Sequence, residues 1–188
     1  DGTIVAGGEA GQIYKINPAT GTIATIANTG GFVLGVCLDS VGSIYACDCR
    51  RNQVLKIDST GNVSTYSTGT HEHKLVNPNY CAFDKEGNLF FTASGEYFHS
   101  EGTGKLFVVT VEGETQCVHP GPLRFANGIC IDPQNAILYL VQSTGPNVLA
   151  FSLDGPRLGS LQPVQVFELE PDTVPDGIAL DVERNLYI

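Results

Sequence analysis

The sequence of 188 residues is poor in positive charge and contains no methionine and no tryptophan. Its 10 Lys and Arg residues stand against 20 Asp and Glu residues, which gives a formal net charge of −10. A field of this sign repels phosphate backbones and anionic lipid headgroups. We therefore expect neither nucleic acid nor a membrane surface as a partner.

Long apolar segments are absent as well. No run of about 18 apolar residues is present to form a membrane-spanning helix, and the N-terminus lacks the basic and apolar stretch of a secretory signal. We expect a cytoplasmic protein. A secreted or periplasmic location stays open, because a chain that starts at Asp1 is expected to begin inside a longer protein.

Six cysteines are present, and their spacing indicates packing rather than cross-linking. Cys37 and Cys130 take matching positions in two predicted strands, and Cys81 lies one residue away from that position in a third. Small apolar side chains are typical of such buried positions. We expect these thiols to be reduced.

The residues that are abundant favour sheet and tight turns. There are 22 Gly and 10 Pro, together with many Val, Ile, Thr, Phe and Tyr residues. Four segments align without gaps on one Asp each, at Asp39, Asp84, Asp132 and Asp181, which lie 45, 48 and 49 residues apart (39 to 84, 84 to 132, 132 to 181). A turn and a second apolar strand follow each Asp, and two further strands precede the next repeat.

Four strands in a period near 45 residues predict an all-β protein, a β-propeller of four-stranded blades, with about four blades present. We expect one propeller domain, 1–188, that is incomplete at both ends. The predicted units are a partial blade 1–33, the blades 34–78, 79–126 and 127–175, and a partial blade 176–188.

Polar residues recur where the first strand of a blade begins. Five positions before each Asp the sequence has Leu34, Asn79, Asn127 and Asp176. First strands line the central channel, so three consecutive blades direct an oxygen toward the axis. Amide and carboxylate oxygens suit Ca²⁺ or Mg²⁺. Asn and Asp are also ordinary turn formers, which is the alternative interpretation of each residue.

Three segments carry a family resemblance: 77–84, 126–129 and 174–181. They resemble the ligand-bearing segments of the gluconolactonase and senescence-marker-protein (regucalcin) family, whose members are six-bladed, bind a divalent cation in the channel and hydrolyse lactones. The resemblance implies that Asn79, Asn127 and Asp176 are metal-site residues. It also implies that a Glu of the first blade, outside this sequence, completes the set, and that Leu34 marks the blade without a ligand.

The expected function is therefore a metal-dependent lactonase or esterase with one divalent cation. Ca²⁺ is the first choice, with Mg²⁺, Mn²⁺ and Zn²⁺ left open, and the partner is a small lactone or ester. Asp176 is the candidate general base. Candidate substrate-binding residues are Glu96 and His99, in the long loop 94–103, and Arg50.

Two features keep other interpretations open. Sugar lactonases of the family carry an Arg two residues before the first Asn and an Asp just after it, whereas this sequence has Asn77 and Tyr80. This departure puts sugar-acid lactones in doubt as substrates. The alternative function is a non-catalytic propeller, NHL-like or strictosidine-synthase-like, that acts as a binding module.

Overall fold

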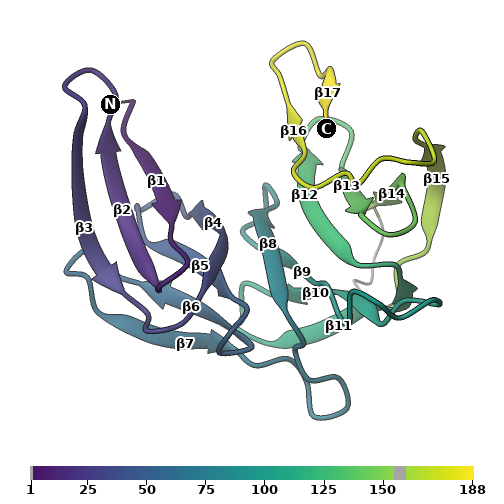
Figure 1. The fold of residues 1–188 in the computed structure, drawn as a ribbon, viewed down its shortest axis with the longest axis horizontal. Helices are drawn as coiled ribbons and strands as arrows, with labels where there is room; N and C mark the ends of the chain where they lie inside the picture. Colours follow the sequence, from purple (N-terminus) through teal and green to yellow (C-terminus); the bar gives the residue numbers. More distant parts are fainter. Residues whose placement is uncertain (1, 155–159) are drawn as a thin grey trace.

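The computed structural model describes residues 2–154 and 160–188, and every named element in them is a β-strand. The strands form five antiparallel sheets that follow one another along an open arc (Figure 1). Across the described ranges, no helix is long and apolar enough to span a membrane.

Three of the sheets have four strands, and the other two have three and two. The first sheet contains β1 (Ile4–Gly7), β2 (Gln12–Asn17) and β3 (Thr22–Asn28). The second contains β4 (Val33–Leu38), β5 (Ile44–Asp48), β6 (Gln53–Ile57) and β7 (Val63–Ser67). The third contains β8 (Pro78–Phe83), β9 (Leu89–Ala93), β10 (Gly104–Val109) and β11 (Thr115–Leu123). The fourth contains β12 (Ala126–Asp132), β13 (Ile137–Gln142), β14 (Asn147–Ser152) and β15 (Pro163–Glu168), and β16 (Ala179–Leu180) pairs with β17 (Leu186–Tyr187).

The propeller predicted from the repeat is confirmed. Consecutive strands pair in order within each sheet, and the inner strands β4, β8 and β12 lie side by side. The first sheet has three strands, in the order β1-β2-β3, and the last sheet is the hairpin β16-β17.

The repeated Asp residues form the turns between the first and second strands. The Asp84 carboxylate accepts hydrogen bonds from the backbone N–H of Asn88 at 2.8 Å and from its Nδ2 at 2.7 Å. Asp181 and Asn185 repeat the arrangement at 2.8 and 2.9 Å. Gly87 has φ of 93°, a left-handed conformation that other residues rarely adopt. These Asp residues are thus structural, and they end every inner strand on the same face of the propeller.

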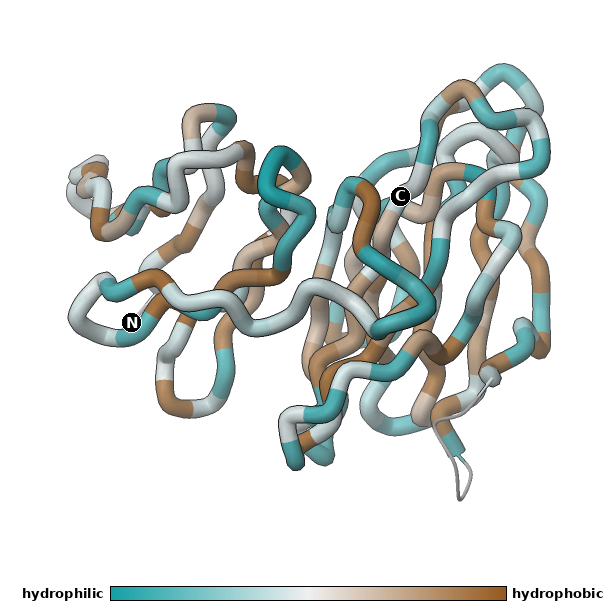
Figure 2. The backbone as a smooth tube through the Cα atoms, turned by 90° about the horizontal axis from the view of Figure 1, so that it is seen from below, coloured by the Kyte–Doolittle hydropathy of each residue, from teal (hydrophilic) through white to brown (hydrophobic). Residues whose placement is uncertain are grey.

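Apolar side chains fill the spaces between neighbouring sheets. Four phenylalanines are fully buried, and two of them, Phe91 and Phe107, stack with ring centroids 5.3 Å apart. Figure 2 shows the apolar segments running along the strands, with hydrophilic residues gathered at the turns. All six cysteines are free.

Candidate functional site

The site is built where the inner strands begin, on the face opposite the Asp turns. The pairs Val33↔Asp48, Pro78↔Ala93 and Ala126↔Gln142 fix the same register in three sheets. In each sheet the ladder is irregular directly after this pair. The ring positions Leu34, Asn79 and Asn127 therefore lie in bulges, which redirect side chains out of a regular pleat.

A cavity of about 460 Å³ opens at this face. Asn79 and Asp176 both line it, although they lie 97 positions apart in sequence (79 to 176). Glu9, Phe32 and Leu34 line the same cavity. The structure thus brings two of the three predicted metal-site residues to one hollow.

Asn127, the third predicted residue, is buried beside them. The backbone N–H of Gly128 donates to the carbonyl of Asp176 at 2.9 Å, which ties the two ring positions together. A Cβ atom on Gly128 would come within 2.6 Å of that oxygen, so only glycine permits the approach.

The Asn127 side chain is held at one end and unpaired at the other. Its Nδ2 donates to Ser143 Oγ at 3.0 Å, whereas its buried Oδ1 has no hydrogen-bond partner among the described residues. Ser143 Oγ donates in turn to the carbonyl of Pro175 at 2.7 Å, one residue before Asp176. Thr110 carries the other unpaired buried oxygen of the described residues, in the β10–β11 turn on the opposite face.

Asn79 repeats this arrangement one blade earlier. Its Nδ2 donates to Ser94 Oγ at 2.9 Å, and Ser94 Oγ donates to the carbonyl of Ala126 at 2.7 Å, one residue before Asn127. Each serine thus holds the amide of its own blade and the backbone of the next. We call the pairs Asn79–Ser94 and Asn127–Ser143 the Asn–Ser relays.

The second sheet has a different pair at the same positions. The Cys49 N–H donates to Phe32 O at 2.9 Å, just as the N–H groups of Ser94 and Ser143 donate to Asn77 O and Phe125 O at 2.8 and 3.1 Å. Leu34 and Cys49 therefore stand where the other blades carry Asn and Ser. Burial, and then the charge of Asp48, raise the pKa of the Cys49 thiol.

Two further polar groups reach the cavity. Glu9, in the loop between β1 and β2, lines the cavity beside Asn79, and sequence reasoning missed it. The loop that carries Glu9 follows the second strand of its blade, as do the loop 94–103 and Arg50 in their blades. Site residues were predicted in those two loops, and the same rule applied to the first blade would have found Glu9. Tyr80 also lines the cavity, and burial raises the pKa of its hydroxyl.

The three predicted substrate-binding residues are exposed and are not among the residues that line this cavity. Glu96 and His99 lie in the loop after β9, which is closed by a hydrogen bond of 2.7 Å from the Glu96 N–H to Thr103 Oγ1. Arg50 follows β5, and its neighbour Arg51 donates to the carbonyl of Thr29. The predicted catalytic residue, Asp176, is exposed to solvent at the cavity.

Within residues 2–154 and 160–188, no group of three or more His, Cys, Asp and Glu side chains is placed to hold a metal ion. A cation here would therefore depend on the amide oxygens of Asn79 and Asn127 with the Asp176 carboxylate. The unpaired, buried Asn127 Oδ1 fits such a cation, because a buried oxygen without a partner is costly in a folded protein.

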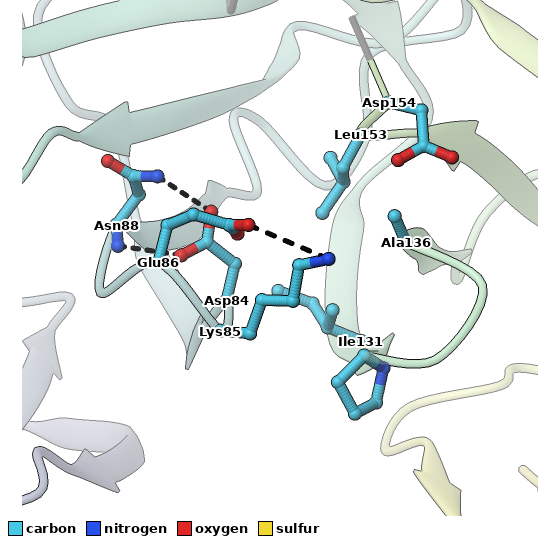
Figure 3. Close-up of a pocket in the computed structure, with 9 residues that line it drawn as sticks. Asp84, Lys85, Glu86, Asn88, Ile131, Ala136, Leu153 and Asp154 are labelled. Carbon is cyan, nitrogen blue, oxygen red and sulfur yellow. Dashed lines mark hydrogen bonds and ion pairs between the residues drawn. The ribbon is translucent and has the colours of Figure 1, made fainter.

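A second cavity, of about 300 Å³, lies on the opposite face between the turns of the third and fourth sheets (Figure 3). Asp84 faces it, but its carboxylate is already occupied by Asn88, and Lys85 pairs with Glu86 at 3.7 Å. These groups serve the turn, and the residues of the candidate site do not reach this cavity.

The fold and the ring of polar residues define a β-propeller with a candidate site at the mouth of its channel. The chain belongs to the SMP-30/gluconolactonase/LRE-like family, whose model matches residues 8–188. The family named from the three motifs is thereby confirmed.

Individual relatives are distant. Diisopropyl-fluorophosphatase of Loligo vulgaris is 25% identical over 206 residues, which cover 98% of this chain and 64% of that protein. Protein strictosidine synthase-like 13 of Arabidopsis thaliana is 20% identical over 158 residues, covering 78% of this chain and 38% of that protein. The solved gluconolactonase of Xanthomonas campestris has a TM-score of 0.81 at 19% identity, covering 98% of this chain and 64% of its own. The chain thus spans less than two thirds of the length of these relatives.

Proposed function

We propose that this chain carries most of the active site of a divalent-cation-dependent hydrolase that opens lactones. The single observation that carries the proposal is the buried Asn127 Oδ1, which has no protein partner while its Nδ2 is fixed by Ser143. Membership of a family that includes gluconolactonases, together with the likeness to diisopropyl-fluorophosphatase, supports a hydrolase.

The proposed ligands are Asn79, Asn127 and Asp176. Two amide oxygens and one carboxylate form an all-oxygen set, which suits Ca²⁺ first and Mg²⁺ or Mn²⁺ next, whereas Zn²⁺ prefers nitrogen and sulfur ligands. The relays orient the set. With Nδ2 of each Asn committed to a serine, each Oδ1 is the end of the amide that remains to face a cation.

A bound divalent cation would polarise the lactone carbonyl and lower the pKa of bound water. Side chains of this protein would supply the proton transfer and the hydrogen bonds. Asp176 accepts a proton from the attacking water or orients it. The water oxygen bonds to the carbonyl carbon, the ring C–O bond breaks, and the ring oxygen takes up a proton, which gives a hydroxy acid without any oxidation or reduction. Tyr80 also lines the cavity, and its phenol can donate a hydrogen bond to the substrate.

The test uses the full-length protein, freed of metal with EDTA. Calorimetric titration with Ca²⁺ should give one site, and lactone opening followed in a pH-stat should disappear with EDTA and return with Ca²⁺. Asn127→Ala should lose affinity for Ca²⁺ by at least about 100-fold, whereas Asn127→Asp, which keeps an oxygen in place, should bind. Asn62→Ala, in an exposed turn, is the matched control and should bind Ca²⁺ with the affinity of the unmodified protein.

Three outcomes separate the alternatives. Activity that persists in EDTA, or full activity in Asp176→Ala, contradicts the proposal. Cation binding without hydrolysis of any lactone or ester would instead identify a binding propeller. Equal Ca²⁺ affinity in Asn127→Ala and Asn62→Ala would remove Asn127 from the site.

A further inference from the structure

One loop beside the candidate site is longer than its counterparts. Ten residues, 94–103, join β9 to β10, whereas four residues join the corresponding strands of the other sheets, at 8–11, 49–52 and 143–146. The loop starts at Ser94, the relay partner of Asn79. The additional length is therefore placed at the mouth of the channel.

The loop presents aromatic side chains to water. Phe98 is 96% exposed and Tyr97 is 42% exposed. Tyr97 packs edge-on against Phe98 and Phe125, with ring centroids 5.1 and 4.8 Å apart. Phe125 lies two residues before Asn127 and Tyr97 three residues after Ser94, so the Tyr97–Phe125 contact joins the segments that carry the two Asn–Ser relays. We call Tyr97, Phe98 and Phe125 the aromatic rim.

The loop is held in place by polar contacts of its own. Thr103 Oγ1 accepts the Glu96 N–H at 2.7 Å, and Asn77 Nδ2 donates to the carbonyl of Gly95 at 3.0 Å. Folding does not require Phe98, because its ring is not buried. The three rings do not line the cavity itself, but they form an exposed apolar patch on the same face of the propeller, and such patches on loops are typical of ligand contacts.

The cavity itself offers few groups that could recognise a sugar. Of the side chains that line it, Glu9, Asn79, Tyr80 and Asp176 can form hydrogen bonds, and two of these are proposed ligands. Phe32 and Leu34 supply an apolar wall on the other side of Asn79. Among residues 2–154 and 160–188, no Arg or Lys lines this cavity. The part of the site that this chain supplies therefore offers an acidic substituent no cationic partner.

On these grounds we infer that the substrate is a lactone with an apolar substituent, an alkyl chain of several carbons or an aryl group, which lies against the aromatic rim with Phe98 as its main contact. The inference rests on the proposed lactonase function and deepens it. Burial of a methylene group favours binding by about threefold to fourfold. On a rim that is partly open, lengthening the substituent from methyl to pentyl should raise kcat/KM by at least about tenfold.

The experiment compares γ-butyrolactone, γ-valerolactone, γ-nonalactone and glucono-δ-lactone as substrates of the full-length protein with Ca²⁺. We expect the order nonalactone, valerolactone, butyrolactone, with gluconolactone poorest. Phe98→Ser should remove most of the dependence of kcat/KM on the length of the alkyl substituent. Val182→Ser is the matched control, since Val182 is 99% exposed in the β16–β17 turn on the opposite face, and it should keep the full dependence.

A binding measurement keeps the inference testable without turnover. The chain contains no tryptophan, so Phe98→Trp adds one indole whose emission is obtained by subtracting the spectrum of the unmodified protein. An alkyl γ-lactam, which resists hydrolysis, should shift this emission to shorter wavelength and saturate, whereas unsubstituted γ-butyrolactam should not. Two results would overturn the inference and leave the lactonase proposal intact. One is preferred hydrolysis of gluconolactone together with a kcat/KM that does not change with the length of the alkyl substituent. The other is the same dependence of kcat/KM on substituent length in Phe98→Ser and Val182→Ser. Absence of all lactone hydrolysis refutes the lactonase proposal, and the lactam titration then decides about the rim.

Discussion

Ser143 is the residue whose removal tests most directly how the site is held together. Its hydroxyl accepts the Asn127 Nδ2–H at 3.0 Å and donates to the Pro175 carbonyl at 2.7 Å. In Ser143→Ala both partners remain buried without a hydrogen bond. An unsatisfied buried group costs about 1–3 kcal/mol, so we expect the free energy of unfolding to fall by about 2–3 kcal/mol.

Cation binding should weaken independently of this loss. Without Ser143 the Asn127 amide is free to rotate, and no contact then selects Oδ1 over Nδ2 as the atom that faces the cation. Loss of a group that orients a metal ligand typically lowers metal affinity by 10- to 100-fold. We therefore expect the Kd for Ca²⁺ of Ser143→Ala to rise by a factor in this range, measured by calorimetry at a temperature where the variant is fully folded.

The control and the refuting result follow from the same geometry. Ser64 bonds only to the Lys56 carbonyl, at 3.4 Å on an exposed strand, so Ser64→Ala should change neither the unfolding free energy by more than about 0.5 kcal/mol nor the Kd. If Ser143→Ala is less stable but binds Ca²⁺ as tightly as Ser64→Ala, Ser143 only supports the backbone. If the free energy of unfolding of Ser143→Ala is unchanged as well, the result contradicts the hydrogen bonds of Ser143 to Asn127 and Pro175.

Three further predictions concern the site, the core and the thiols. Gly128→Ala places a Cβ atom 2.6 Å from the Asp176 carbonyl, so it should push the two ring positions apart and weaken Ca²⁺ binding at least about tenfold by calorimetry. Phe91→Ala removes one ring of the buried stack with Phe107 and should lower the unfolding free energy by about 3–5 kcal/mol in urea titrations. Burial raises the pKa of Cys130 from 9.0 to about 12, which favours the protonated thiol in the folded state. The contribution of this thiol to the free energy of unfolding is full below pH 9 and is lost as the pH rises toward 12. The drop in Tm between pH 8 and pH 11 should therefore be smaller in Cys130→Ala than in the unmodified protein.

The fold could be predicted from the sequence because the repeated residues form contacts with residues close to them in the sequence. Each Asp at the end of an inner strand fixes a turn through its own carboxylate, as Asp84 does with Asn88, so a short motif reports a structural position. Counting back from such a residue also gave the ring positions, since Asn79 and Asn127 share one register in the structure. Such local motifs can be recognised in a sequence without knowledge of tertiary contacts.

The rest of the site depends on contacts that no local pattern reports. Ser94 and Ser143 meet their Asn partners across a bulged pair of strands, and the bulge shifts the pairing by an amount that strand periodicity does not give. Glu9 reaches the cavity through the path of its loop. Glu96 and His99 were predicted from the same kind of loop, yet its aromatic residues, Tyr97 and Phe98, make the ring contacts at the rim.

The second sheet, which has Leu34 at the ring position, indicates what the relays do. At Leu34 the amide is replaced by an apolar side chain, and at Cys49, the position of the relay serine, the hydroxyl is replaced by a weak hydrogen-bonding thiol. The sheet itself is complete without either polar group, since its four strands pair as in the other blades. A serine at this position is therefore not needed to build a blade. It occurs in the two blades that carry an Asn at the ring position, where its hydroxyl both holds the Asn amide and ties the backbone of the next blade.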